Sequence, residues 1–128
     1  MKPGNVQIGD HYLLEGRVVT VVGILENLAV LRPSRGFMQV VRQKDLQPIP
    51  VTPEILEKNG FVPMSYEDCY EMKRESFRVR VFMDEEGMMV AADRGEDSAQ
   101  KDGRRELQLL QQTMRFVGIE QKLEASHG

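Results

Sequence analysis

The sequence contains a single cysteine, Cys69, so no disulfide bond can form within the chain, as expected for a reducing compartment. The net charge of −3 excludes a polycation that would bind nucleic acid over its whole surface. Tryptophan is absent and aromatic residues make up 6%, which argues against an aromatic-lined peptide groove. No apolar run approaches the ~20 residues of a membrane span, and residues 1–10 lack the apolar core of a signal peptide. These absences predict a soluble, cytoplasmic protein with no membrane partner.

The chain also lacks the short motifs that bind metals or cofactors. It has no CxxC, no HExxH and no glycine-rich phosphate loop, so we expect no metal and no cofactor. What it has is ordinary: 128 residues, of which 41% are hydrophobic and 29% charged. A chain of this size buries enough surface to fold without a metal or a disulfide.

The first fifty residues carry strand and turn signals and no helical period. Glu15-Gly16 is a candidate two-residue hairpin turn, although glutamate tolerates a positive φ poorly. The β-branched strand 17–24 has apolar residues on both faces, which predicts burial on both sides. Short strands joined by tight turns predict a small SH3-like β-barrel over residues 1–51, with an open meander as the alternative. The strands are expected at 11–14, 17–24, 28–31 and 37–42, with a helical turn at 44–46.

Residues 52–61 (TPEILEKNGF) predict a short helix with a stop signal at each end. Thr52 is placed to accept a hydrogen bond from a first-turn amide, and Pro53 occupies a position where no N–H is needed. Gly60 can adopt the left-handed conformation, which brings Phe61 against Leu56 in a Schellman cap. A helix of this length is unstable alone. We therefore interpret it as a structural clamp between the barrel and the rest of the chain.

An antiparallel meander of three strands is expected next, at 66–73, 76–83 and 88–92. The polar segment 93–103 is expected to be a mobile loop. A C-terminal amphipathic helix at 104–117 follows, with one apolar stripe and a second glycine stop at Gly118-Ile119. The last residues, 121–128, are expected to fray.

Residues 48–61 (PIPVTPEILEKNGF) resemble a motif of small uncharacterised proteins from Bacteroides-type bacteria and their phages or mobile elements. The opening Ile8-Gly9-Asp10 and the Leu107-Gln108 pair of the last helix are similar to features of that family. The chain departs from the family pattern by having Arg105 where a histidine is typical. The resemblance implies an architecture and a genomic setting, and it implies no activity.

Catalytic candidates are few. Of the two histidines, His127 lies in the tail, and only His11, next to Asp10, can act as an oriented base. Cys69 has an acidic neighbour that raises the cost of forming a thiolate, so we interpret it as a core residue. We therefore expect no enzymatic activity.

Two clusters of basic residues are candidate contacts for an anion or a partner. Arg78 and Arg80 share one face of a strand. Lys101, Arg104 and Arg105 gather where the last helix is expected to start, and exposed amides there favour anions. The alternative is that Asp102 caps that helix while the arginines point into water.

The sequence thus predicts an α+β protein with a barrel at 1–51 and a helix, meander and helix at 52–128, packed as one unit. The function we expect is non-enzymatic binding of a macromolecule. A protein is the favoured partner because an SH3-like barrel offers loops and open strand edges, and methionines supply adaptable apolar surface. Nucleic acid, held by the basic clusters, is the alternative.

Overall fold

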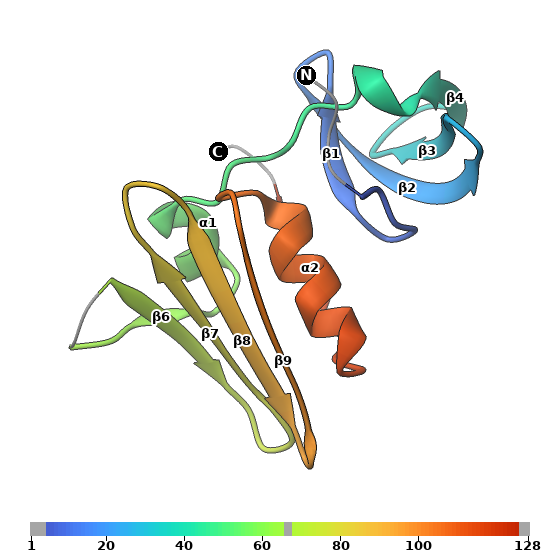
Figure 1. The fold of residues 1–128 in the computed structure, drawn as a ribbon. Helices are drawn as coiled ribbons and strands as arrows, with labels where there is room; N and C mark the ends of the chain where they lie inside the picture. Colours follow the sequence, from blue (N-terminus) through green and yellow to red (C-terminus); the bar gives the residue numbers. More distant parts are fainter. Residues whose placement is uncertain (1–4, 66–67, 126–128) are drawn as a thin grey trace. The chain divides into compact units, whose positions relative to one another are not determined.

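The computed structural model describes residues 5–65 and 68–125. They divide into two compact units: unit 1 comprises the described residues up to Ile49 with Ala125, and unit 2 comprises Pro50–Glu124. Each unit contains one antiparallel sheet, and both α-helices of the described residues belong to unit 2 (Figure 1). The α+β class is therefore confirmed.

Unit 1 is a meander in which each strand pairs with the next along the chain. The Glu15-Gly16 turn is confirmed: φ is 51° at Glu15 and 81° at Gly16, the two positive values of a type I′ hairpin. The strands are β1 (His11–Leu14), β2 (Arg17–Leu25), β3 (Leu28–Pro33) and β4 (Gln39–Arg42), followed by the 3₁₀ turn η1 (Gln43–Asp45).

The core of unit 1 lies on one face of this sheet. Val19 and Val21 of β2 are 3% and 1% exposed, whereas Val18 and Thr20 on the opposite face are only half-buried. The prediction that β2 is buried on both sides is therefore wrong, because one side of the strand faces away from the core that the described residues of unit 1 form. The core comprises Val6, Tyr12, Val19, Val21, Ala29, Leu31 and Leu46.

The Ile8-Gly9-Asp10 motif has a structural explanation. Gly9 has a φ of 97°, and its N–H donates to the carbonyl of Val21. The carboxylate of Asp10 is fully buried and accepts hydrogen bonds from the N–H of Gln7 at 2.9 Å and the hydroxyl of Tyr12 at 3.2 Å. Asp10 thus ties the entry turn to the core of unit 1.

After η1 the chain returns to β1. Leu13 and Gln47 exchange two backbone hydrogen bonds of 2.8 and 2.9 Å, which form an isolated antiparallel bridge. Among the described residues this bridge does not extend into a further strand, and no closed barrel is found. The sheet therefore ends at β1 on one side and at β4 on the other.

Unit 2 has more strands than expected. The prediction of a mobile loop at 93–103 is wrong: the chain turns at Gly95, whose φ is 62°, and pairs with β8 over its whole length. Tyr66 and Glu67, which we placed in a strand, lie outside the described residues. The sheet order is β5 (Val62–Pro63), β6 (Cys69–Lys73), β7 (Arg78–Met83), β8 (Met88–Arg94) and β9 (Asp97–Gly103).

Helix α2 (Leu107–Phe116) packs along β8 and β9 (Figure 1). Its apolar stripe is buried as predicted, and the N–H of Ile119 donates to the carbonyl of Met114 at 3.0 Å past Gly118, whose φ is 81°. The predicted start at residue 104 is wrong, because the strand β9 continues to Gly103 and Glu106 is the N-cap. No helix in the described ranges is long and apolar enough to cross a membrane.

Helix α1 (Pro53–Lys58) has the predicted caps and lies in unit 2. The hydroxyl of Thr52 accepts the N–H of Ile55 at 3.2 Å, and Pro53 is the first helical residue. Gly60 has a φ of 90°, and the N–H of Phe61 donates to the carbonyl of Leu56 at 2.9 Å. Leu56 and Phe61 are buried, so the caps fix α1 within unit 2.

The C-terminal segment is not frayed as predicted, at least as far as Ala125. The side-chain amide of Asn59 donates to the carbonyl of Glu124 at 2.8 Å, and its oxygen accepts the N–H of Glu124 at 2.6 Å. Leu123 is 3% exposed. Asn59, the C-cap of α1, therefore holds this segment in place through its side chain.

Candidate binding surfaces

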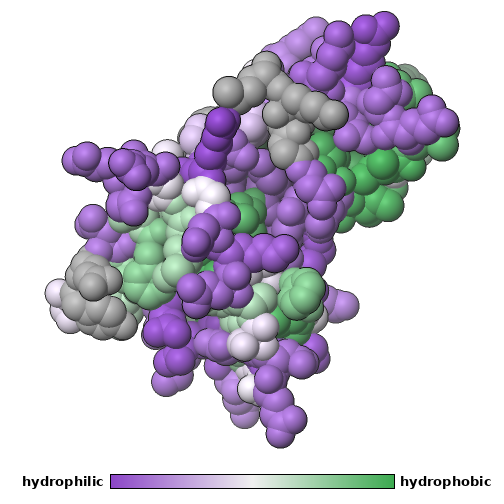
Figure 2. Space-filling model, in the orientation of Figure 1, coloured by the Kyte–Doolittle hydropathy of each residue, from purple (hydrophilic) through white to green (hydrophobic). Residues whose placement is uncertain are grey.

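The outer face of the unit 1 sheet carries apolar side chains in register. Leu25 lies opposite Leu28, and Val30 lies between Gly23 and Val40 on the neighbouring strands. We call Leu25, Leu28, Val30 and Val40 the apolar face. Leu25 is 67% exposed and Val40 is 63% exposed. In the orientation of Figure 2, hydrophobic residues gather on the visible side of unit 1 around β2.

Two further large apolar residues directly precede β4. Phe37 is 93% exposed and Met38 is 62% exposed. Gly36 before them has a φ of 98° in the turn that leads out of β3. Single exposed apolar residues are ordinary, but a group of them on one strand and in the residues just before it is typical of an interaction surface.

Basic residues surround this surface. They are exposed, and within the described residues no carboxylate lies within 4.0 Å of any of them. Their positive charge is therefore not neutralised by an ion pair in the described part of the chain, although Glu26, in the turn between Leu25 and Leu28, lines a pocket with Arg42 and Lys44. The residues are Arg32, Arg35, Arg42 and Lys44.

A shallow groove of about 880 Å³ runs beside β4. Val40 and Val41 form one side, and Leu14 with Gln47 belong to the β1 side. Lys44 also lines it, together with the acidic residues Glu15 and Asp45. The groove separates the two edge strands of the unit 1 sheet, where a barrel would close.

The outer face of the unit 2 sheet holds the predicted pair Arg78 and Arg80. A side-chain nitrogen of Arg78 lies 3.9 Å from a carboxylate oxygen of Asp93. The guanidinium carbon of Arg80 lies 6.0 Å from the centre of the Phe82 ring, and Glu71 is its partner in the register. This face therefore carries charges of both signs, with Lys73 also opposite Arg78 in the register.

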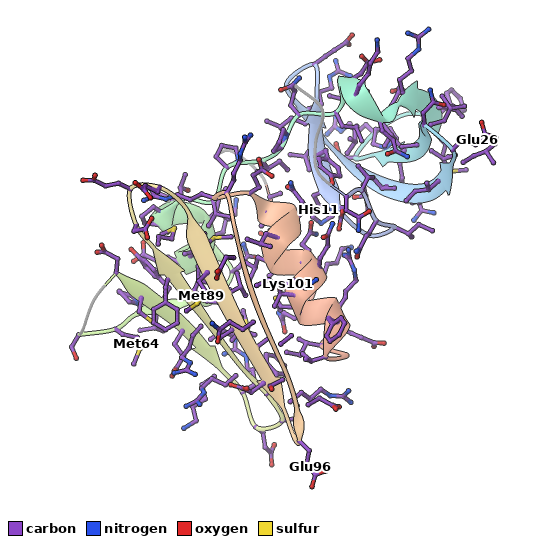
Figure 3. The ribbon with its side chains drawn as sticks, viewed as in Figure 1. His11, Glu26, Met64, Met89, Glu96 and Lys101 are labelled. Atoms are coloured by element: carbon purple, nitrogen blue, oxygen red, sulfur yellow. The ribbon has the colours of Figure 1, made fainter. Side chains whose placement is uncertain are left out.

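The second basic cluster is divided between β9 and the residues that directly precede α2. Lys101 lies in β9, and its ammonium is 5.7 Å from the centre of the Phe116 ring of α2 (Figure 3). Arg104 and Arg105 belong to the connection between β9 and α2, and the Nε of Arg105 donates to the carbonyl of Gly87 at 3.4 Å. Asp102 lies in β9 and is not the cap of the helix. Arg104 and Arg105 thus lie next to the start of α2 as predicted, Lys101 does not, and the anion contact itself stays a prediction.

The two catalytic candidates each have a structural setting of their own. The Nδ1 of His11 lies 2.9 Å from the hydroxyl of Thr20 on the next strand. Cys69 is 1% exposed. His127 lies outside the described residues. No group of three His, Cys, Asp or Glu side chains that could hold a metal occurs in the residues that the structure describes.

The apolar face and its basic border are what sequence reasoning missed. We identified 37–42 as a strand and did not recognise it as the edge of a sheet. The available signal was the order of a meander: the last strand of a simple meander has only one neighbour. Comparisons with protein-family models, curated proteins and solved structures found no match.

Proposed function

We propose that this protein is a non-enzymatic module that binds another protein through the apolar face of unit 1. The exposure of Leu25 and Val40 on that face is the observation that carries the proposal. Burying apolar surface contributes roughly 25 cal/mol per Å², so covering such a face favours association. Exposed apolar surface of this kind is characteristic of protein contacts.

A finer description of unit 1 belongs to the same proposal. We propose an SH3-like arrangement, in which the residues after η1 run beside β1. The Leu13–Gln47 bridge and the 3₁₀ turn after β4 support it. The resemblance of residues 48–61 to proteins of phages and mobile elements supports such a setting for the partner.

Nucleic acid is the second candidate partner. The observation that favours it is the arginine Arg80 beside the aromatic ring of Phe82 on a solvent-facing sheet, since such faces bind single strands by charge and stacking. The carboxylates of Glu71 and Asp93 on the same face repel phosphate. Protein is therefore the favoured partner.

Selection from a random displayed-peptide library tests the proposal. We expect the wild-type protein to enrich peptides and the Val40→Ser variant to lose that enrichment. Val62→Ser is the matched control, because Val62 is 60% exposed on the edge strand of the other sheet. Equal loss in the two variants, or no loss in either, would contradict binding at the apolar face.

A mobility-shift assay with single- and double-stranded DNA and RNA tests the second candidate. Salt-sensitive binding that Arg80→Gln abolishes and Val40→Ser leaves intact would replace the protein-binding proposal with the nucleic-acid one. We expect no shift at moderate salt.

A further inference from the structure

We infer that β4 is a docking strand, which pairs through its outer edge with an extended segment of the partner protein. The segment would have apolar residues at alternate positions and acidic residues at its ends. This inference rests on the proposed function and specifies the chemistry of the partner.

The outer edge of β4 is open. In the order β1-β2-β3-β4 this strand has one neighbour, and its pairs all join it to β3. Among the described residues, no backbone hydrogen bond joins Gln39, Val40 or Val41 to a second strand. An edge of this kind offers N–H and C=O groups to an added strand.

The other edges of the two sheets are protected. The edge strand β5 has two residues, one of which is Pro63 and has no N–H to donate. The edge strand β9 is exposed and polar, with charged residues such as Asp97 and Lys101. On the outer side of β1, Leu13 already pairs with Gln47. Among the edge strands of the described residues, β4 is therefore the one with two adjacent valines and an open outer edge.

The groove beside β4 has the position that an added extended segment requires. The groove beside Val40 and Val41 lies where an added strand would run. Alternate side chains of that strand would meet Val40 of the apolar face, while the others would enter the groove.

The charges favour an acidic segment over a second copy of this chain. Arg35 precedes β4, Arg42 ends it and Lys44 follows, and none has an ion pair in the described ranges. Two copies paired through β4 would bring these positive ends together, whereas acidic ends on a partner would neutralise them. Acidic residues also lie near two of these positions: Glu15 and Asp45 line the groove with Lys44, and Glu26 lines a second pocket with Arg42 and Lys44. Arg35 lines neither, so the end of the segment beside Arg35 has the clearest preference for negative charge.

Synthetic peptides about seven to nine residues long, an ordinary strand length, test the inference. The probe has alternating valine and threonine with two aspartates at each end, and the comparison peptide has lysines there. We expect the aspartate peptide to bind and the lysine peptide to bind at least about tenfold more weakly at low salt. N-methylation of alternate amides in the peptide should also weaken binding about tenfold, because it removes strand hydrogen bonds without altering the protein.

Variants of the protein locate the site. Replacing both Arg42 and Lys44 by glutamine should weaken the binding of the aspartate peptide about three- to tenfold at low salt. The difference should disappear at high salt. The matched control replaces Arg78 and Lys73 of unit 2 with glutamine and should leave the affinity unchanged. Peptide-induced shifts of backbone amide resonances should centre on Gln39–Val41.

Several results would overturn the inference. They are equal binding of the two peptides, absence of saturable binding, resonance shifts centred in unit 2, and dimerisation of the protein through β4. Tighter binding of an oligonucleotide than of the aspartate peptide at these β4 residues would overturn it as well. If displayed peptides still depend on Val40 while the aspartate peptide fails, only the docking-strand inference is wrong, and the proposed function stands.

Discussion

The two sheets of this protein differ in how their solvent faces are built. On the unit 2 sheet, Arg78 lies near Asp93 and Arg80 lies over Phe82, so these two arginines have an opposite charge or a ring beside them. On the unit 1 sheet, Leu25 and Val40 stand in solvent. On the unit 2 face, Arg78 and Arg80 have interacting neighbours within the same sheet. The unit 1 face has exposed apolar surface that a partner can cover.

This difference assigns different roles to two similar meanders. Both bury one sheet face, and both use tight turns that depend on glycine, such as Gly16 in unit 1 and Gly95 in unit 2. The unit 2 face carries charged side chains that are fully or partly exposed, although the Nε of Arg80 is buried and has no hydrogen-bond partner among the described residues. We therefore attribute binding to unit 1 and a supporting role to unit 2.

The largest expected effect concerns the independence of the two cores. Phe61→Ala in unit 2 should reduce the free energy of unfolding by about 3–5 kcal/mol, and Leu31→Ala in unit 1 by about 2–5 kcal/mol, since each leaves a cavity. Phe61 is 2% exposed and Leu31 is fully buried. Thermal melting measures the loss, and hydrogen exchange shows which unit opens.

We expect Phe61→Ala to raise exchange in unit 2 only, because the cap that it completes lies within that unit. Leu31→Ala should raise exchange in unit 1. Equal rises in both units after either change would contradict separate cores and would instead support α1 as a clamp between them. An unchanged melting temperature after Phe61→Ala would rule out either role for the cap.

The features that sequence reasoning predicted correctly are local. The glycine stops at Gly60 and Gly118 were predictable because one residue type supplies the left-handed conformation that the cap needs. The alternation in β7 was also sufficient, because Val79 and Val81 are buried while Arg78 stays exposed. In each case neighbouring residues alone determine the structure.

The features that were missed depend on distant parts of the chain. Strand β9 has no apolar alternation, and its hydrogen bonds come from pairing with β8. The segment at Glu124 is ordered because Asn59, far away in sequence, bonds to it. The exposure of Val40 depends on the strand order of the sheet, which no local pattern encodes.

A smaller effect is expected at the hydrogen bonds that join α1 to the C-terminal segment. Asn59→Ala removes bonds to the carbonyl of Ile55 and to the backbone of Glu124, and should cost about 1–3 kcal/mol. Amide exchange at Glu124 should rise. The control is Asn27→Ala in an exposed turn of unit 1. If exchange at Glu124 rises equally in the two variants or in neither, the side chain of Asn59 does not hold the segment.

The smallest effect is expected at the charged face of unit 2. Side chains of Arg78 and Asp93 are 43% and 39% exposed and 3.9 Å apart, so water and salt screen their attraction. A double-mutant cycle with Arg78→Gln and Asp93→Asn should give a coupling of about 0.2–1 kcal/mol that falls as salt is added. The mutations should leave peptide binding at β4 unaltered. No measurable coupling at low salt would mean that Arg78 and Asp93 do not satisfy each other, and the contrast with the apolar face of unit 1 would no longer identify unit 1 as the binding side.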